Sequence, residues 1–123
     1  MRKDIEKYIN EKYKQLQEHP WKEYPEYSTF KHKDNGKWFA LIMDVPYEKL
    51  GINKEGRADV INVKHFPELI GSARKEEGVL PAYHMNKEYW LTILLDGTVP
   101  KERIYESIDI SYGLTMKKSK GKK

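Results

Sequence analysis

The sequence contains no cysteine, which removes several kinds of chemistry at once. Disulfides, thiolate metal sites and a cysteine nucleophile are all excluded. The chain also lacks a long apolar run: no window approaches the ~18 to 20 apolar residues that a membrane-spanning helix needs, and the N-terminus offers no apolar signal segment. We therefore expect a cytoplasmic protein with no membrane partner.

The motifs of common enzyme classes are missing as well. The glycines lie singly, so no glycine-rich phosphate loop is present, and there is no Gly-x-Ser-x-Gly nucleophile elbow. The four histidines show neither an HExxH pattern nor a close pair, and without cysteine a zinc site would need distant carboxylates. We expect no enzyme activity, no metal and no cofactor.

Acidic residues are absent from the end of the chain, and this locates the positive charge. The formal net charge is +4, but no Asp or Glu follows Asp109. The last seven residues, 117–123, hold five of the 23 Lys and Arg side chains, which leaves 18 basic against 19 acidic side chains elsewhere. We expect a nearly neutral single domain over residues 1–114 and a disordered basic tail over residues 115–123.

The remaining composition is sufficient for one core. A chain of 123 residues with 38% hydrophobic and 12% aromatic side chains can bury a single core but not two. Helical spacing of apolar residues predicts an amphipathic helix over residues 3–18, which ends at His19-Pro20 because the residue before a proline avoids helical geometry. Two more helices are expected to begin near Pro67 and Pro100 and to end at Gly78 and Gly113.

Strand-like stretches separated by turn signals make up the rest. Asn35-Gly36 predicts a hairpin, followed by a strand over residues 38–45 that is either central or covered on much of both faces. In that strand we expect one alternating set to comprise Phe39, Leu41, Met43 and Val45. Further strands are expected over residues 58–66, 79–84 and 89–95. Hairpins without strand–helix–strand units predict a mainly antiparallel sheet with helices on one face, an α+β architecture.

The stretch from Gly78 to Trp90 carries the densest group of functional side chains. These side chains could donate hydrogen bonds to phosphates or base edges from a protruding hairpin, and the rings could stack on bases; the candidates are His84, Asn86, Lys87, Tyr83 and Tyr89. Alternatively, Asn86 only shapes the turn, Lys87 is solvated and the rings fill the core. The sequence leaves both interpretations open.

Two other basic segments could contact phosphate. The predicted hairpin at Asn35-Gly36 carries Lys31, Lys33 and Lys37, and its role becomes stronger if the two hairpin turns are neighbours. The tail begins with Lys117 and Lys118 and can attract a polyanion through counterion release without reading sequence. Both segments are equally explained as solvated surface that keeps the protein soluble.

Five short motifs occur in a fixed order along the chain. They are Asn-Gly-Lys-Trp-Phe-Ala-Leu-Ile at residues 35–42, Pro-Glu-Leu at 67–69, Gly-Val-Leu-Pro-Ala-Tyr-His-Met-Asn-Lys at 78–87, Trp-Leu-Thr at 90–92 and Leu-Asp-Gly-Thr-Val-Pro at 95–100. Together they resemble the MmcQ/YjbR family over about residues 20–114. The resemblance implies a CyaY-like (frataxin-like) two-layer α+β fold and a DNA-binding role in the bacterial cytoplasm, and it brings no catalytic residues.

The chain departs from the family pattern at two positions. Tyr89 stands where members often have His, which weakens any paired-histidine site, and Phe66 stands where they often have an Asp that would cap a helix. Frataxin-like proteins bind iron along an acidic ridge of their first helix. Here that helix mixes Asp and Glu with Lys, so the resemblance does not imply iron.

These patterns favour a non-enzymatic, monomeric DNA-binding protein that contacts phosphates through its basic hairpins and lysine tail. The alternative is a protein- or small-ligand-binding module that uses the aromatic surface near Tyr83 and Trp90. A convex basic face would favour DNA. A concave apolar pocket beside His84 would favour the alternative.

Overall fold

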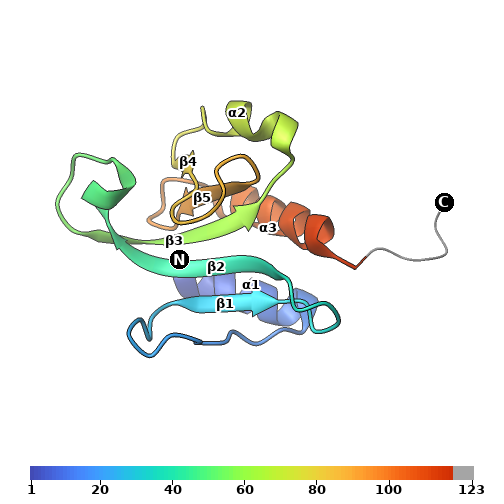
Figure 1. Cartoon of the computed structure of the whole chain (residues 1–123). Helices are drawn as coiled ribbons and strands as arrows, with labels where there is room; N and C mark the ends of the chain where they lie inside the picture. Colours follow the sequence, from blue (N-terminus) through green and yellow to red (C-terminus); the bar gives the residue numbers. More distant parts are fainter. Residues whose placement is uncertain (118–123) are drawn as a thin grey trace.

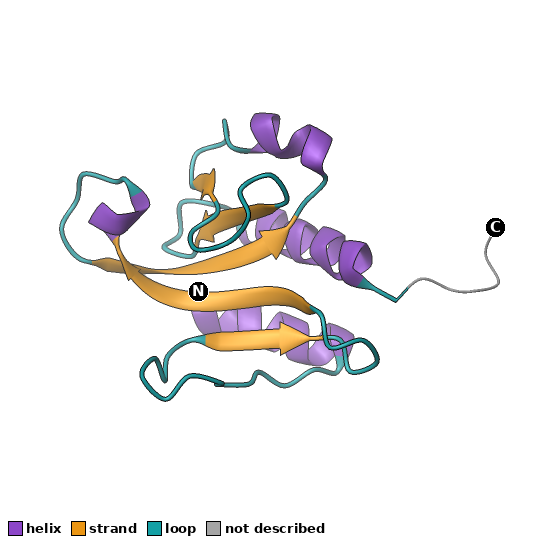
Figure 2. Ribbon diagram, in the orientation of Figure 1, coloured by secondary structure: helices purple, strands orange, loops and turns teal. Residues whose placement is uncertain are grey.

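A five-stranded antiparallel sheet organises the chain, whose residues 1–117 are described by a computed structural model. The sheet order is β1-β2-β3-β5-β4, and every neighbouring pair is antiparallel. Figures 1 and 2 show the two long helices, α1 and α3, behind one face of this sheet. The elements are α1 (Arg2–Tyr13), β1 (Ser28–Lys31), β2 (Trp38–Pro46), η1 (Tyr47–Leu50), β3 (Arg57–Lys64), η2 (Pro67–Leu69), α2 (Ile70–Ala73), β4 (Val79–Pro81), β5 (Trp90–Leu94) and α3 (Lys101–Thr115).

The two faces of the sheet are covered differently. On one face, fully buried isoleucines of α1 and α3 pack onto the sheet and form the larger core; they are Ile5, Ile9, Ile104 and Ile108. On the other face, loops cover a smaller cluster that includes Leu41, Met43 and Val60. This is the expected α+β two-layer fold, with its long helices on one face.

A β-bulge changes the alternation expected in β2. Phe30 pairs with Ala40, but the next residue, Lys31, pairs with Trp38, so Phe39 is an extra residue in the strand. Phe39 belongs to the helix-side core, whereas Leu41 and the following alternate residues face the loops. The expected grouping of Phe39 with Leu41 was therefore wrong, because alternation in a sequence does not show where an extra residue enters.

The first helix ends earlier than its periodicity suggests. Lys14 adopts a left-handed conformation with φ 56°, which stops α1 at Tyr13. The Asn10 side-chain amide donates to the Gln15 carbonyl oxygen at 2.6 Å and supports this reversal. Leu16, which lies within the expected range of the helix, is consequently outside it and 79% exposed.

Residues 66–89 hold less regular structure than expected. The helix after Pro67 is only a 3-10 turn followed by one α-helical turn, and β4 ends at Pro81 instead of continuing to residue 84. Phe66 occupies the N-cap position of η2 and makes no side-chain hydrogen bond to the helix. This is expected because Phe66 replaces the Asp that family members often have as a cap. None of the helices within residues 1–117 combines the length and apolarity that crossing a bilayer requires.

Candidate nucleic-acid interface

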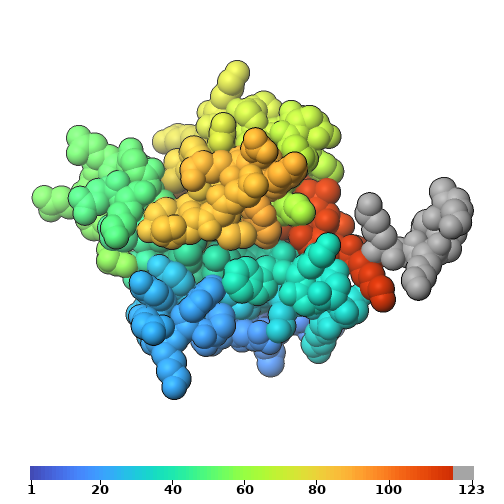
Figure 3. Space-filling view, in the orientation of Figure 1, coloured from blue at the N-terminus to red at the C-terminus, as the bar shows by residue number. Residues whose placement is uncertain are grey.

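The β1–β2 turn (residues 32–37) and the β4–β5 loop (residues 82–89) lie at the same end of the sheet. Lys31 pairs with Trp38, and Lys64 pairs with Trp90, so β1 and β3 end where β2 and β5 begin. Only β3 separates β2 from β5, which places them roughly 10 Å apart. In Figure 3 the turquoise turn and the orange loop appear on the same face of the molecule. The two predicted basic segments are therefore neighbours.

A hollow of about 300 Å³ lies at this end of the sheet, where β2 and β5 begin and β3 ends, and we call it the end hollow. Two lysines and two tryptophans line it together with a glycine and a threonine; the residues are Gly36, Lys37, Trp38, Lys64, Trp90 and Thr115. No carboxylate is among them. Lys37 is exposed, whereas Lys64 and both indoles are half-buried. The lining thus combines positive charge with large aromatic side chains. Proteins that bind single-stranded nucleic acid use this combination.

The C-terminal end of α3 holds the β1–β2 turn in place. Buried His32 has its Nε2 atom 2.8 Å from Thr115 Oγ1, and the Asn35 amide donates to the Thr115 carbonyl oxygen at 2.9 Å. These bonds require α3 to continue through Gly113, where the sequence had suggested its end. Gly36 follows with φ +72°, a conformation that glycine adopts readily. The backbone of the turn, which carries Lys33 and Lys37, is therefore held in position by α3.

The three predicted lysines of this hairpin differ in availability. Lys33 and Lys37 are exposed at the turn. Lys31 lies within β1, and its Nζ atom is 3.5 Å from a carboxylate oxygen of Glu18. A phosphate contact through Lys31 would compete with this ion pair, whereas Lys33 and Lys37 belong to no ion pair among residues 1–117.

A buried polar pair in the sheet supports the β4–β5 loop. Asn62 and Thr92 are fully buried on the loop-covered face, and Thr92 Oγ1 donates to Asn62 Oδ1 at 2.5 Å. The Asn62 amide donates to the Tyr83 carbonyl oxygen at 2.9 Å, while the Tyr83 N–H donates to Thr92 Oγ1 at 2.8 Å. The sheet therefore fixes the loop through its backbone. An asparagine between the apolar residues Ile61 and Val63 was the sequence signal for this support, and it was missed.

The loop shows distinct roles for its candidate residues. Asn86 Oδ1 accepts the backbone N–H two residues later at 2.8 Å, and its carbonyl oxygen accepts the Trp90 N–H at 3.0 Å, so Asn86 shapes the turn. His84 is exposed in a left-handed conformation with φ 61°, and its ring centroid lies 4.0 Å from that of Tyr83. Lys87 is exposed. His84 and Lys87 are therefore the loop members best placed to reach a ligand.

A second hollow lies beside His84, between η1 and the loop. Its volume is about 440 Å³, and it is lined by Lys49, Leu50, Gly51, Pro81, Ala82, Tyr83, His84 and Lys87. The lining is mixed: apolar side chains form part of it, and two lysines and a histidine supply donors. This surface is concave, but it is not the wholly apolar pocket that would favour an uncharged ligand.

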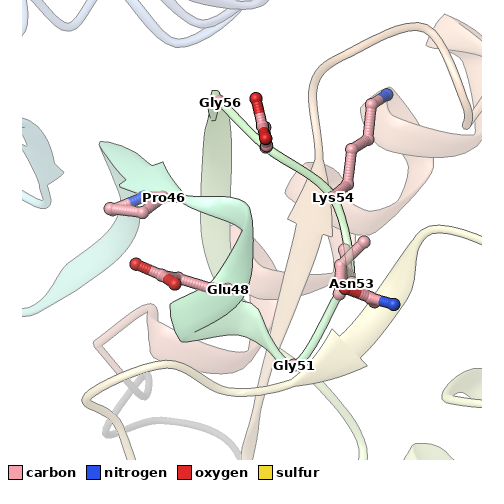
Figure 4. A pocket seen from close by; sticks show the side chains of 8 residues that line it. Pro46, Glu48, Gly51, Asn53, Lys54 and Gly56 are labelled. Carbon is pink, nitrogen blue, oxygen red and sulfur yellow. The ribbon is translucent and has the colours of Figure 1, made fainter.

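Another hollow, of about 680 Å³, lies within the segment of residues 46–56 (Figure 4). Every lining residue comes from this one segment, which closes on itself where the Tyr47 N–H donates to the Gly56 carbonyl oxygen at 3.0 Å. Lys54 Nζ lies 4.7 Å from the centroid of the Tyr47 ring. We interpret this hollow as the interior of a loop, because no other element contributes a side chain.

The basic tail begins next to the β1–β2 turn. Met116 and Lys117 line a small hollow together with Lys33 and Asp34. Lys117 is thus brought to the same end of the molecule as the two turns. The expected start of the tail at residue 115 was wrong, because Thr115 is the buried last residue of α3. Lys118, also predicted to contact DNA, lies outside the described residues, as do residues 119–123.

The titratable side chains with shifted pKa values lie outside the end hollow. Burial would raise the pKa of Asp109, but hydrogen bonds from Tyr13, Lys12 and Tyr8 lower it. A hydrogen bond from Arg103 holds the pKa of Glu76 below its usual value. Within residues 1–117, no group of three or more His, Asp or Glu side chains is arranged to hold a metal ion. These ion pairs connect structural elements and lie away from the lining of the end hollow.

Comparisons with known proteins agree with the motif pattern. The family model described as YjbR matches residues 10–114. The uncharacterised protein YyaQ of Bacillus subtilis is 44% identical over 114 residues, which cover 93% of this chain and 97% of YyaQ. The uncharacterised protein YjbR of Escherichia coli K12 is 40% identical over 53 residues, covering 42% of this chain and 45% of that protein.

Solved structures share the fold. The crystal structure of a Pseudomonas syringae protein is 48% identical, covers 94% of this chain and 99% of its own, and superposes with a TM-score of 0.92. The Deinococcus radiodurans protein DR2400 is 27% identical, with a TM-score of 0.71 and coverage of 100% of this chain and 82% of its own. With a family match over most of its length, the chain belongs to the YjbR family, as its motifs indicated.

Proposed function

We propose that this chain is a non-enzymatic DNA-binding domain that contacts the phosphate backbone with the end of its sheet. The convergence of basic segments at that end is the observation that supports the proposal most. Lysines from the β1–β2 turn, the end of β3, the β4–β5 loop and the start of the tail gather there; they are Lys33, Lys37, Lys64, Lys87 and Lys117. Convergence of separate basic segments gives a polyanion several simultaneous contacts.

Lysines at this end, like several lysines elsewhere on the surface, lack carboxylate partners among residues 1–117. On α1, Lys7 and Lys12 have carboxylate partners in Glu11 and Asp109, at 4.0 and 3.0 Å. Within residues 1–117, Lys37, Lys64 and Lys87 form no ion pair. Asp34 in the β1–β2 turn and Glu88 in the β4–β5 loop are also exposed. They reduce the local net charge, which remains positive. The unpaired ammonium groups are the ones that can neutralise phosphates.

Titration of labelled DNA over a series of salt concentrations tests this proposal. We expect the logarithm of the association constant to fall linearly with the logarithm of salt concentration, with a slope of about −0.9 for each phosphate neutralised on duplex DNA. Lys87→Ala should weaken binding, whereas the matched variant Lys7→Ala, on the helix-covered side, should not. Binding that is absent or independent of salt would contradict the proposal.

A second candidate function is the binding of a small anion in the hollow beside His84. Lys49, His84 and Lys87 line a concave site of about 440 Å³, which favours a compact anionic ligand. Inorganic phosphate is a suitable first probe, with amide chemical shifts as the measurement. Shifts confined to η1 and the β4–β5 loop, in a protein that does not bind DNA, would favour this second function over the first.

A further inference from the structure

The two tryptophans of the end hollow are not used in either core. Trp38 and Trp90 belong neither to the helix-side cluster nor to the loop-side cluster, nor to the partly buried side chains packed on them. Trp21, in contrast, packs on the loop-side cluster. Half-buried indoles that belong to no core cluster expose part of their apolar faces at the surface, and such faces indicate a binding surface when they lie together.

The sheet positions both rings around one lysine. Lys64, the last residue of β3, stands directly opposite Trp90 on β5, while Trp38 begins β2 on the other side of β3. Trp21 contacts Trp38 edge to face, with centroids 5.6 Å apart and planes at 76°, and so restricts the Trp38 ring. The aromatic surface is therefore formed before any ligand arrives, which lowers the entropic cost of binding.

We infer that the end hollow binds unpaired bases of single-stranded DNA, with Trp38 and Trp90 stacking on bases while Lys37 and Lys64 neutralise the adjacent phosphates. This inference rests on the proposed DNA-binding function and specifies its substrate class. In a duplex the bases stack on each other and present only their edges, so the indole faces would have no partner. The volume of about 300 Å³ lies at the lower end of ligand pockets and suits single bases better than a helix.

The charge of the lining supports a nucleotide over an uncharged aromatic ligand. Lys37 and Lys64 flank the rings, and no carboxylate lines the hollow to repel a phosphate. Stacking tolerates any base because every base has a π-face. The site therefore predicts binding with little sequence preference, and affinity that comes from both stacking and charge.

Three labelled oligomers separate the contribution of bases from that of phosphates. Oligothymidine supplies unpaired bases, an abasic oligomer of equal length supplies the phosphates alone, and a duplex of equal length supplies stacked bases. We expect the full chain to bind oligothymidine at least about thirtyfold tighter than the abasic oligomer, because each of the two stacked bases contributes ~1–3 kcal/mol. Tryptophan fluorescence should be quenched by oligothymidine only.

Variants assign the effect to the two rings. Trp90→Ala should reduce the preference for oligothymidine by about tenfold, because one of the two stacking rings is lost, and should leave the affinity for the abasic oligomer unchanged. Trp90→Phe should restore part of the preference. Tyr105→Phe serves as the control because Tyr105 packs on the helix-side core and does not line the hollow, and it should keep the preference. Unfolding curves of each variant show whether the fold is retained.

The outcomes separate this inference from the function on which it rests. Equal affinity for oligothymidine and the abasic oligomer, or tighter binding of the duplex, would overturn base stacking while leaving DNA binding in place. A preference for oligothymidine that survives Trp90→Ala and Trp38→Ala would overturn the assignment to this hollow. Failure to bind any of the three oligomers would contradict the proposed function itself.

Discussion

Gly78 is the residue whose identity the fold constrains most tightly. Its φ is +87°, and a Cβ atom added there would lie 2.5 Å from the Val99 Cγ2 atom. Gly78→Ala should therefore combine backbone strain of ~1–2 kcal/mol with an overpacking cost of ~1–3 kcal/mol. Gly97→Ala is the matched control: its φ is +96°, but no atom lies within 4 Å of the added Cβ. Equal losses of unfolding free energy in urea for the two variants would contradict a role for the Val99 contact.

His65 links stability to pH. The side chain is 4% exposed and its Nδ1 atom has no partner within residues 1–117. Burial lowers the pKa of His65, and the nearby Arg103 charge acts in the same direction. The unfolded chain, with a histidine pKa near 6.5, then binds more protons than the folded one. Stability from this residue is complete above about pH 6.5 and is lost as pH falls toward the lowered folded-state pKa.

Replacement of His65 should remove this pH dependence. We expect the unfolding free energy of the unmodified chain to decrease between about pH 7 and pH 5, and the decrease to be smaller in His65→Gln. His19→Gln, which changes an exposed histidine, should leave the slope as it was. Chemical denaturation at several pH values provides the measurement. A slope that is identical in His65→Gln and the unmodified chain would contradict this account.

Among single residues, the sequence identified the exposed Lys and His side chains better than it identified the residues that position them or lie beside them. His84, Lys87, Lys33 and Lys37 were chosen because they flank turns, and the structure leaves each of them exposed. Lys64 was missed because an alternating strand assigns its side chain to a face without showing what lies beside it. That information depends on the register with β5, which pairs it with Trp90.

At the scale of elements, one carboxylate joins the two long helices. Asp109 of α3 accepts hydrogen bonds from the Tyr8 and Tyr13 hydroxyls of α1, at 2.8 and 2.5 Å, and from Lys12 at 3.0 Å. Tyr8 also stacks on Tyr105 with centroids 4.0 Å apart. The carboxylate is therefore the polar centre of an aromatic contact that holds α1 against α3.

Asp109→Asn should loosen α1 selectively. We expect a loss of about 1–3 kcal/mol in unfolding free energy, because hydrogen bonds to a charged acceptor are stronger than those to a neutral one. Hydrogen exchange of α1 amides should accelerate more than that of β3 amides. Asp4→Asn is the control, since Asp4 is exposed with its oxygen 3.8 Å from Lys101 Nζ and such pairs contribute ~0–1 kcal/mol. Uniform acceleration in all elements would contradict a local role for Asp109.

The order and types of the elements could be predicted from local patterns, whereas several of their ends could not. Asn35-Gly36 marked the first hairpin correctly because turn chemistry is local. The ends of β4 and α1 depend on contacts that no local pattern contains. Asn62 and Thr92 hold residue 83 in the loop, and Asn10 closes α1 through residue 15. Non-local side-chain bonds therefore decide where regular structure stops.

For the molecule as a whole, the fold determines where the positive charge lies, whereas the sequence composition shows only the net charge. Apart from residues 117–123 the chain is nearly neutral, yet the strand order brings lysines from separate segments to one end. The tail starts at that same end. Composition predicted a basic tail and the motifs predicted the family, but the convergence follows only from the strand order and register.

The most direct test of this account is the salt dependence of single-stranded DNA binding in a triple variant of the end hollow and its border. Replacement of Lys37, Lys64 and Lys87 by alanine should reduce the magnitude of the salt slope by about 2, because each contact on a single strand contributes ~0.7. The charge-matched variant with Lys3, Lys7 and Lys75 replaced should keep the original slope. Equal reductions in both triple variants, or no reduction in the first, would contradict the assignment of DNA binding to this end of the sheet.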